Sequence, residues 1–302
     1  MSFEKDISAI LPAVARAVEL ARRAQKSGLA EKTTKSDGTA VTAADYAAQF
    51  ILTKAIEEHF PGDAVVAEET AENTGAADAA LKLLGNTGRD DFVETLGRGG
   101  GGGGGRFWTV DPIDGTAGFV DGAHFCVAVA LIVEGEAAAG ALGCPGLGFI
   151  MSAARGGGVR KKPVAGEKTD LLIKQGGSGR GPVLCESARA REQAYADTGE
   201  IMRRAGGRGR SVRMDGQGKY ALIAEGRADV YIRVPNRRRR ESVWDHAAGT
   251  AIAEAAGARV ADFDGDALDF GAGRTLPKNR GIVAARGGVF EKVLRAIKDA
   301  GL

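Results

Sequence analysis

The residues best suited to chemistry are two aspartates three positions apart, Asp111 and Asp114, in the segment Trp-Thr-Val-Asp-Pro-Ile-Asp-Gly-Thr at 108–116. Carboxylate oxygens are ligands that Mg²⁺ prefers, and free backbone N–H groups at a turn bind phosphate oxygens. Gly115 and Thr116 follow at once and supply such N–H groups and a hydroxyl. This spacing predicts a metal-assisted site for phosphate-ester hydrolysis. A plain turn is the alternative, because Asp-Pro and Asp-Gly pairs are common in turns.

Further acidic residues stand at the ends of predicted elements. Asp45 follows Thr42 by three residues, a spacing that also predicts a capping box at a helix start. Glu68 and Glu69 end an apolar strand. Neighbouring side chains on a strand point to opposite faces, so only one of the two enters a shared site easily. The alternative is that both are surface acids. Asp245 precedes an alanine-rich helical run, where an ordinary N-cap is the alternative. If these carboxylates meet, their mutual repulsion raises their pKa values, and divalent cations relieve it.

The composition is that of a globular protein with nearly balanced charge. The chain has 302 residues, a formal net charge of +2 and three cysteines without metal-ligand spacing. The small net charge gives no field that favours nucleic acid, and the few cysteines favour a reducing, cytoplasmic compartment. The longest apolar run, 125–133, is too short to span a bilayer. Acidic residues among the first six argue against a signal or transit peptide. We therefore expect a cytoplasmic protein with neither nucleic acid nor membrane as a partner; organelle and oligomeric state stay open.

The elements that must position the acidic residues alternate between helix and strand. Apolar periodicity predicts helices over 3–28, 45–60, 193–205, 217–226 and 245–256, with one or two more between 72 and 97. Apolar runs predict strands over 64–67, 107–110, 125–135, 137–142, 183–185 and 230–234, and an edge hairpin or boundary over 154–163. The alternation predicts a layered α/β (α+β) fold. We expect an N-terminal subdomain over 1–165, which carries most of the acids, and a C-terminal subdomain over 166–302.

Two biased segments and the histidines fall outside this pattern. The glycine run 99–105 has no side chains to pack and no Walker lysine, which favours a flexible loop tip over a phosphate-binding loop. The arginine run 237–240 indicates a solvated loop or, alternatively, a basic rim that attracts an anionic substrate. The histidines are interpreted as structural or exposed, with a supporting role beside a metal ligand as the alternative for His246.

Three of these motifs, in this order, resemble the lithium-sensitive, Mg²⁺-dependent phosphatase superfamily that includes inositol monophosphatase. They are Ala-Glu-Glu at 67–69, Asp-Pro-Ile-Asp-Gly-Thr at 111–116 and Trp-Asp-His-Ala-Ala-Gly at 244–249. Finer features are similar to the 3′(2′),5′-bisphosphate nucleotidase branch, in the segments 35–49, 116–119, 142–145, 219–220, 228–233 and 269–275. The resemblance covers nearly the whole chain and is weakest over 72–105 and 160–210.

The resemblance implies a layered α-β-α-β-α sandwich of the inositol monophosphatase and fructose-1,6-bisphosphatase type, and a role for each site residue. It implies that two or three Mg²⁺ ions are coordinated by the carboxylates of Glu68, Asp111, Asp114 and Asp245 and by the backbone carbonyl of Ile113. Asp45 and Thr116 would position and deprotonate the attacking water. The backbone N–H groups of Gly115 and Thr116 would hold the phosphate, and Lys219 and Arg233 would contact the nucleotide.

The implied substrate is adenosine 3′,5′-bisphosphate, a small-molecule nucleotide cleaved to AMP and phosphate, with 3′-phosphoadenylyl sulfate as a second candidate. Lithium sensitivity and a role in sulfur metabolism follow from the same resemblance. Two departures bear on the substrate. Gly216 stands where the family usually has serine, so a hydroxyl contact is lost or replaced by backbone, and the segment 185–193 lacks a histidine often seen there. An inositol-phosphate phosphatase of the same superfamily and a noncatalytic nucleotide-binding regulatory protein stay as alternatives.

Overall fold

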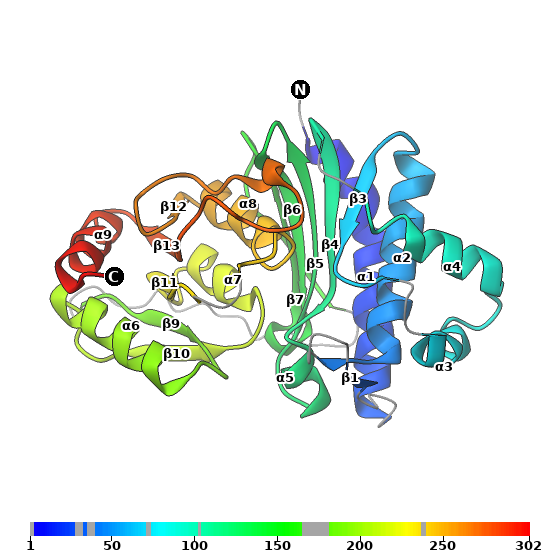
Figure 1. The fold of residues 1–302 in the computed structure, drawn as a ribbon, viewed down its shortest axis with the longest axis horizontal. Helices are drawn as coiled ribbons and strands as arrows, with labels where there is room; N and C mark the ends of the chain where they lie inside the picture. The colour runs from blue at the N-terminus through cyan, green and yellow to red at the C-terminus, as the bar shows by residue number, and fades with distance from the viewer. Residues whose placement is uncertain are drawn as a thin grey trace.

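Two β-sheets alternate with layers of helices in the computed structural model, which describes residues 3–27, 33–34, 40–70, 74–101, 104–164, 181–236 and 240–302. Outer helices, a six-stranded sheet, inner helices, a five-stranded sheet and a second set of outer helices follow one another across the molecule (Figure 1). This order confirms the expected α-β-α-β-α layering. Within these residues, no helix combines the length and the apolar character needed to cross a membrane.

The six-stranded sheet belongs to the first half of the chain. Its strands, in spatial order, are β3 (Ala64–Ala67), β4 (Arg106–Asp114), β5 (Cys126–Val133), β6 (Glu136–Cys144), β7 (Phe149–Ala154) and β8 (Arg160–Pro163). β3 runs parallel to β4, and the other neighbours are antiparallel. The central strands are buried along almost their whole length because helices cover both faces. The exposed edge strand β8 carries two lysines and a proline, residues that discourage edge-to-edge association.

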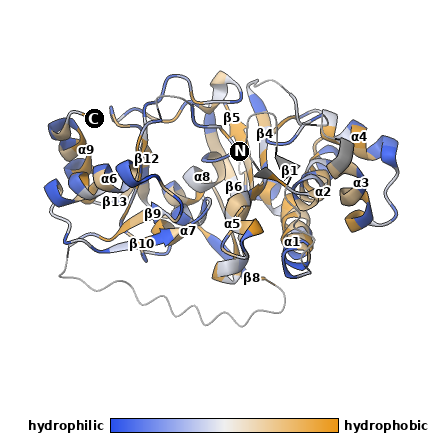
Figure 2. Ribbon diagram, turned by 60° about the horizontal axis from the view of Figure 1, so that its bottom comes forward, coloured by the Kyte–Doolittle hydropathy of each residue, from blue (hydrophilic) through white to orange (hydrophobic). Residues whose placement is uncertain are grey.

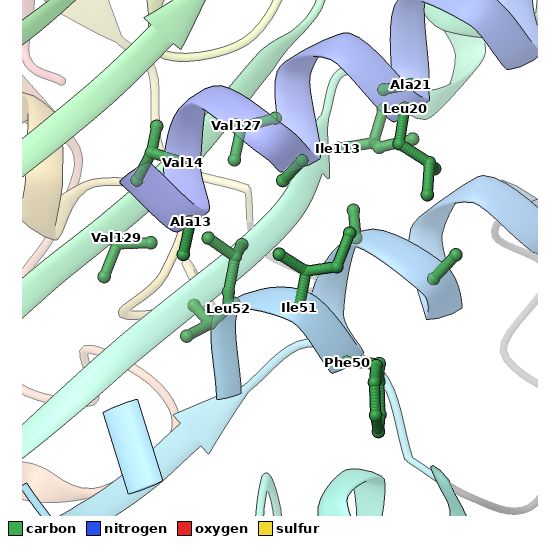
Figure 3. Close-up of a cluster of buried hydrophobic side chains, with 14 of the residues drawn as sticks. Ala13, Val14, Leu20, Ala21, Phe50, Ile51, Leu52, Ile113, Val127 and Val129 are labelled. Carbon is green, nitrogen blue, oxygen red and sulfur yellow. The ribbon is translucent and has the colours of Figure 1, made fainter. Parts of the chain in front are cut away.

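The first layer packs its apolar face on this sheet. The helices α1 (Glu4–Lys26) and α2 (Ala43–His59) contact the sheet, and α3 (Thr74–Leu84) and α4 (Arg89–Gly97) pack on the outer side of α2 (Figure 1). The short hairpin of β1 (Thr33–Thr34) and β2 (Ala40–Val41) lies between α1 and α2 in sequence. Figure 3 shows Val14 of α1, Leu52 of α2 and Val127 of β5 in one buried cluster. Each such aliphatic side chain contributes roughly 1.5–3 kcal/mol when it leaves water. Ile113 belongs to the same cluster, so packing fixes the backbone beside Asp114.

The five-stranded sheet belongs to the second half of the chain. Its spatial order is β10 (Ser211–Met214), β9 (Leu184–Ser187), β11 (Val230–Arg233), β13 (Ile282–Arg286) and β12 (Ala258–Ala261). The helices α7 (Gly218–Ala224) and α8 (Ala247–Ala255) lie between the sheets, and α6 (Glu192–Arg204) and α9 (Val289–Ala300) lie outside (Figure 1). Short helical turns are α5 (Thr116–Val120), η1 (Pro145–Leu147) and η2 (Phe270–Ala272). In Figure 2 hydrophobic colour gathers on the central strands, and the outer helices carry both hydrophobic and hydrophilic colour.

The inner helices approach their neighbours closely because two glycines leave room. A Cβ on Gly140 of β6 would lie 2.7 Å from the carbonyl oxygen of Ala248, and a Cβ on Gly249 of α8 would overlap the ring of Tyr220. Without a side chain at these positions, α8 sits directly on the first sheet and against α7. The second apolar cluster fills the space between the sheets and includes Tyr220 and Trp244. This packing brings the start of α8, and with it Asp245, over the end of β4.

Several sequence-based expectations need correction or fall outside the described residues. Asp111 and Asp114 do not form a turn after the strand, because β4 continues to Asp114 with a register irregularity between the two. The segment 99–101 is not a loop tip: Gly99 O accepts from Ala67 N–H at 2.9 Å, and Gly101 N–H donates to Val65 O at 3.1 Å. Close approach to strand β3, rather than flexibility, explains these glycines. The expected subdomain boundary at 165/166 and most of the arginine run lie outside the described residues.

Candidate functional site

A cleft of about 240 Å³ is lined by half of the predicted site residues. Its lining includes Asp114 and Gly115 from the first half of the chain, and Lys219, Arg233 and Asp245 from the second half. The first two stand at the end of β4 and the start of α5, and the others come from α7, β11 and the turn before α8. The layered packing therefore brings together residues separated by more than a hundred positions.

Three aspartates lie close together at this cleft, and two of them, Asp114 and Asp245, are in its lining. Ligand oxygens of Asp111, Asp114 and Asp245 all lie within 4.8 Å of one another. Asp111 is 1% exposed, and its Oδ1 has no hydrogen-bond partner among the described residues. An orphaned buried carboxylate oxygen beside two other carboxylates is costly unless a cation completes it.

Burial and the charges of neighbouring carboxylates raise the pKa values of these three carboxyls. Burial raises the pKa of Asp114 to about 6, against the opposing Lys219 charge, and burial with the Asp114 charge raises that of Asp245 to about 7. Burial and the Glu68 charge raise the pKa of Asp111 well above its usual range. Glu68 acts on all three groups and therefore lies beside them. A hard divalent cation fits this donor set, because it would satisfy the orphaned oxygen and neutralise the repulsion.

Glu68 and Glu69 separate as strand geometry requires. Glu68 N–H donates to Val110 O at 3.1 Å, which holds it at the end of β3 beside β4. Glu69 is buried, and its backbone is fixed by Gln49 of α2, whose Oε1 accepts from Glu69 N–H at 2.9 Å and whose Nε2 donates to Glu69 O at 2.7 Å. The Glu68 carboxylate raises the pKa of each of the three aspartates.

Asp45 caps a helix and also contacts Thr116. Its Oδ2 accepts from the backbone N–H and the hydroxyl of Thr42, at 2.8 and 2.6 Å, which completes a capping box at the start of α2. Its Oδ1 accepts from the Thr116 hydroxyl at 3.3 Å. The same hydroxyl lies 3.1 Å from the carbonyl oxygen of Ile113. The capping box predicted from the sequence is confirmed, and the capping carboxylate also contacts Thr116.

The residues around Gly115 come close to a turn in the second half of the chain. Gly115 has φ 96°, a left-handed conformation that favours glycine, and α5 begins at the next residue. Gly216 has φ 61°, and a Cβ there would lie 2.6 Å from Asp114 O. Gln217 N–H donates to Asp114 Oδ2 at 2.6 Å. One residue after the position of the expected family serine, a backbone N–H therefore contacts the aspartate.

The two predicted nucleotide-contacting cations lie on the wall of the cleft. Lys219 is buried, donates to Gly216 O and has its Nζ 5.3 Å from the centre of the Tyr231 ring. Arg233 donates from Nε to Glu241 Oε1 at 3.0 Å. Both positive charges face the cleft that holds Asp114 and Asp245.

Sequence reasoning missed three residues that organise this site. Gln217 links Asp114 to α8, because its Nε2 donates to Trp244 O at 2.8 Å and its Oε1 accepts from Gly249 N–H at 2.9 Å. Glu241 accepts from Arg233 and lies 3.3 Å from His246 Nε2, while His246 Nδ1 lies 2.9 Å from the Tyr220 hydroxyl. His246 thus contacts Glu241 and Tyr220 and stands next to the predicted ligand Asp245 in the sequence. Although burial opposes it, hydrogen bonding from His246 and the Arg233 charge lower the pKa of Glu241 to about 2.

The third missed residue, Arg189, bridges the two halves. Its Nη2 donates to Asp121 Oδ2 at 2.9 Å and its Nη1 to Asp215. A Cβ on Gly118 of α5 would lie 2.6 Å from Asp215 Oδ2, so the missing side chain lets this ion pair rest on α5. The only signal in the sequence was an arginine in the segment that lacks the expected histidine.

Comparison with known proteins gives consistent relatives along the whole chain. A model described as the inositol monophosphatase family matches residues 4–302. A 3′(2′),5′-bisphosphate nucleotidase of Schizosaccharomyces pombe is 34% identical, with 98% of this chain and 96% of that protein covered. One of Emericella nidulans is 32% identical, with 99% of both chains covered.

Solved structures agree on the fold. The Thermotoga maritima IMPase has a TM-score of 0.68 at 22% identity, with 99% of this chain and 98% of that chain covered. The extragenic suppressor protein suhB of Bartonella henselae has a TM-score of 0.70 at 20% identity, with 98% and 99% covered. At these identities the likeness concerns the architecture.

Proposed function

The chain belongs to the inositol monophosphatase family, which is metal-dependent, and from that premise we propose that it is a 3′(2′),5′-bisphosphate nucleotidase. It would hydrolyse adenosine 3′,5′-bisphosphate to AMP and phosphate. In support, relatives aligned over nearly their whole length carry the name 3′(2′),5′-bisphosphate nucleotidase. One observation carries the chemistry: acids from both halves of the chain meet within 4.8 Å, next to a threonine–aspartate pair and two cations.

Two or three Mg²⁺ ions would be held by the carboxylates of Asp111, Asp114, Asp245 and Glu68. When bound, Mg²⁺ lowers the pKa of water and stabilises charge on phosphoryl oxygens. The Ile113 carbonyl oxygen lies 3.1 Å from the Thr116 hydroxyl and would keep a lone pair for a cation, because the single proton of that hydroxyl would go to Asp45. Gln217 N–H fixes one oxygen of Asp114, which leaves the other free to turn toward the metal.

Thr116 and Asp45 would move the proton of the attacking water. The Thr116 hydroxyl accepts a proton from water while it donates its own to Asp45 Oδ1, which is within hydrogen-bond reach. The Thr42 contacts hold the Asp45 carboxylate in place through Oδ2. Asp45 thus acts as base without losing its orientation, since only one of its oxygens is used for capping.

Gly115 and Thr116 would hold the scissile phosphate through their backbone N–H groups, and Lys219 and Arg233 would bind the remainder of the nucleotide. Arg233 offers a planar fork and Lys219 a point charge, which suits a ligand with a second anionic group. The cleft adjoins a second cavity of about 220 Å³, and the two share Ser187, Arg189 and Arg233 in their linings. A nucleoside bisphosphate needs such a continuation beyond the reacting phosphate.

A phosphate-release panel tests this function. The purified chain with Mg²⁺ should release phosphate from adenosine 3′,5′-bisphosphate much faster than from inositol 1-phosphate, and Li⁺ should inhibit that reaction. Faster release from inositol 1-phosphate would contradict the nucleotidase and support the inositol-phosphate phosphatase. Tight Mg²⁺-dependent nucleotide binding without release would support a noncatalytic regulator instead. The product from the bisphosphate should be AMP, identified by chromatography.

A further inference from the structure

Arg274 occupies a position between two segments that carry the predicted metal ligands. It follows Gly273, whose φ of 114° turns the chain after η2. Its Nη2 donates to Ala67 O at 2.7 Å, and its Nη1 donates to Gly99 O at 3.1 Å. Ala67 immediately precedes Glu68, so the guanidinium holds the end of strand β3 from which that carboxylate projects.

The same side chain also reaches the second half of the site. Its Cζ lies 4.6 Å from the centre of the Trp244 ring, and Trp244 immediately precedes Asp245. The backbone supports this contact, because Val243 N–H donates to Arg274 O at 3.0 Å and Leu276 N–H donates to Glu241 O at 2.9 Å. Arg274 therefore touches the chain next to Glu68 on one side and next to Asp245 on the other.

The glycine run belongs to this arrangement. Gly99 O accepts from both Ala67 N–H, at 2.9 Å, and Arg274. A Cβ on Gly99 would lie 2.9 Å from Ala67 Cβ, so only glycine brings its carbonyl to this point without displacing strand β3. Burial lowers the pKa of Arg274 and the Glu68 charge opposes that effect, which agrees with a guanidinium close to the carboxylate.

We propose that Arg274 is a positioning residue that sets the spacing between Glu68 and Asp245 and thereby the affinity of the site for Mg²⁺. The inference rests on the proposed metal-dependent function. This positioning role needs the planar fork of arginine, because the guanidinium binds two carbonyls while its plane contacts an aromatic ring. A lysine in its place keeps the charge but loses the fork and most of the ring contact.

Arg286 provides a matched control in the same half of the chain. Its Nη1 also donates to two backbone carbonyls, those of Ile223 and Ala224, at 3.2 and 3.3 Å. These carbonyls lie at the end of α7 and do not adjoin any of the acids in the site. Arg286→Met therefore removes a similar set of contacts and the same charge at a place without a metal ligand.

The experiment titrates MgCl₂ into the full-length chain and follows the unfolding midpoint, which reports affinity without turnover. Arg274→Met should raise the apparent Kd for Mg²⁺ by about 10- to 100-fold, as for partners that orient metal ligands. Arg274→Lys should raise it severalfold, and Arg286→Met should leave it within about twofold of the wild type while lowering the midpoint without metal. If Arg274→Met does not fold, Arg274→Lys decides.

An unchanged affinity in Arg274→Met and Arg274→Lys, or an equal loss in Arg286→Met, would overturn the inference. A different result would contradict the proposed function, namely a wild-type chain that binds Mg²⁺ but releases no phosphate from any substrate in the panel. In that case the titration still decides whether Arg274 positions the ligands.

Discussion

The Thr116 hydroxyl lies 3.3 Å from Oδ1 of Asp45, although the two residues are 71 positions apart in the sequence. Asp45 is fully buried and divides its two oxygens between a helix cap and this contact. A capping box therefore fixes the orientation of the group proposed to take up the proton. The same carboxylate therefore caps helix α2 and contacts the threonine of the proposed proton transfer.

We expect Thr116→Ala to lower kcat by about 10²- to 10⁴-fold, because it removes the hydroxyl through which the proton passes. The affinity for Mg²⁺ should change little, since the carboxylates stay in place. Thr116→Ser keeps the hydroxyl and should retain much of the activity. Steady-state kinetics and a Mg²⁺ titration measure both effects, and equal losses in turnover and metal affinity would contradict the proton-transfer role.

Asp245→Asn should stabilise the metal-free protein at neutral pH while it removes Mg²⁺ binding. The folded-state pKa of Asp245, about 7, is above its usual value, so the folded protein binds more protons than the unfolded chain. The stability linked to this proton is present at low pH and is lost as pH rises toward and through 7. At about 1.4 kcal/mol per pKa unit, the variant should gain on the order of 2–4 kcal/mol at pH 8.

Denaturant unfolding of both proteins in EDTA, from pH 4 to pH 8, measures this difference. The free energy of unfolding of the wild type should fall relative to that of Asp245→Asn across this range. Added Mg²⁺ should restore stability to the wild type only. A wild-type advantage in EDTA at pH 8 would show that the acidic cluster is not a source of repulsion.

Gly216→Ala tests the contact between the turn of Gly216 and the end of β4. The added Cβ would lie 2.6 Å from Asp114 O, and the residue also has a positive φ. We expect a loss of roughly 2–4 kcal/mol in stability together with weaker Mg²⁺ binding. Gly257→Ala is the control, because Gly257 has φ 84° and no atom within 4 Å of its Cβ position. The control should lose only about 1–2 kcal/mol and bind Mg²⁺ normally.

Lys219→Met should raise KM for adenosine 3′,5′-bisphosphate and shift Mg²⁺ binding to higher pH. Burial raises the pKa of Asp114 and the Lys219 charge opposes it, so removal of the lysine moves that pKa above about 6. Lys161 is a matched control, because its Nζ also lies over an aromatic ring, 4.9 Å from the centre of Phe149, and pairs with Glu225 away from the cleft. If Mg²⁺ affinity depends on pH in the same way in Lys219→Met and in Lys161→Met, the electrostatic role of Lys219 would be contradicted.

The sequence was informative wherever one periodicity or one motif described a local element. It predicted strand β3 with its exact bounds and the two acids that end it, because apolar runs and strand alternation are local properties. It could not predict that Gln217 would bind Asp114, Trp244 O and Gly249 at once, since those partners meet only after the sheets pack. An isolated glutamine between glycines has no pattern that indicates such a role.

The misinterpreted glycine run and one unpredicted cysteine contact have the same origin. The glycine run was interpreted from its composition as a loop tip, but Gly99 and Gly101 pair with strand β3, and close backbone approach is invisible in one sequence. Cys126 and Cys144 are 18 positions apart and looked unrelated, yet their Sγ atoms lie 3.4 Å apart on neighbouring strands. Non-local strand register decides both contacts.

The most direct test of the account is the position of bound metal. Crystals soaked in MnCl₂, with diffraction data collected at the manganese edge, should give anomalous peaks within coordination distance of Asp111, Asp114 and Asp245, with Glu68 at the same cluster. Peaks that are absent from this cleft, in a preparation that hydrolyses adenosine 3′,5′-bisphosphate with Mn²⁺, would contradict the claim that acids from both halves of the chain form the catalytic metal site.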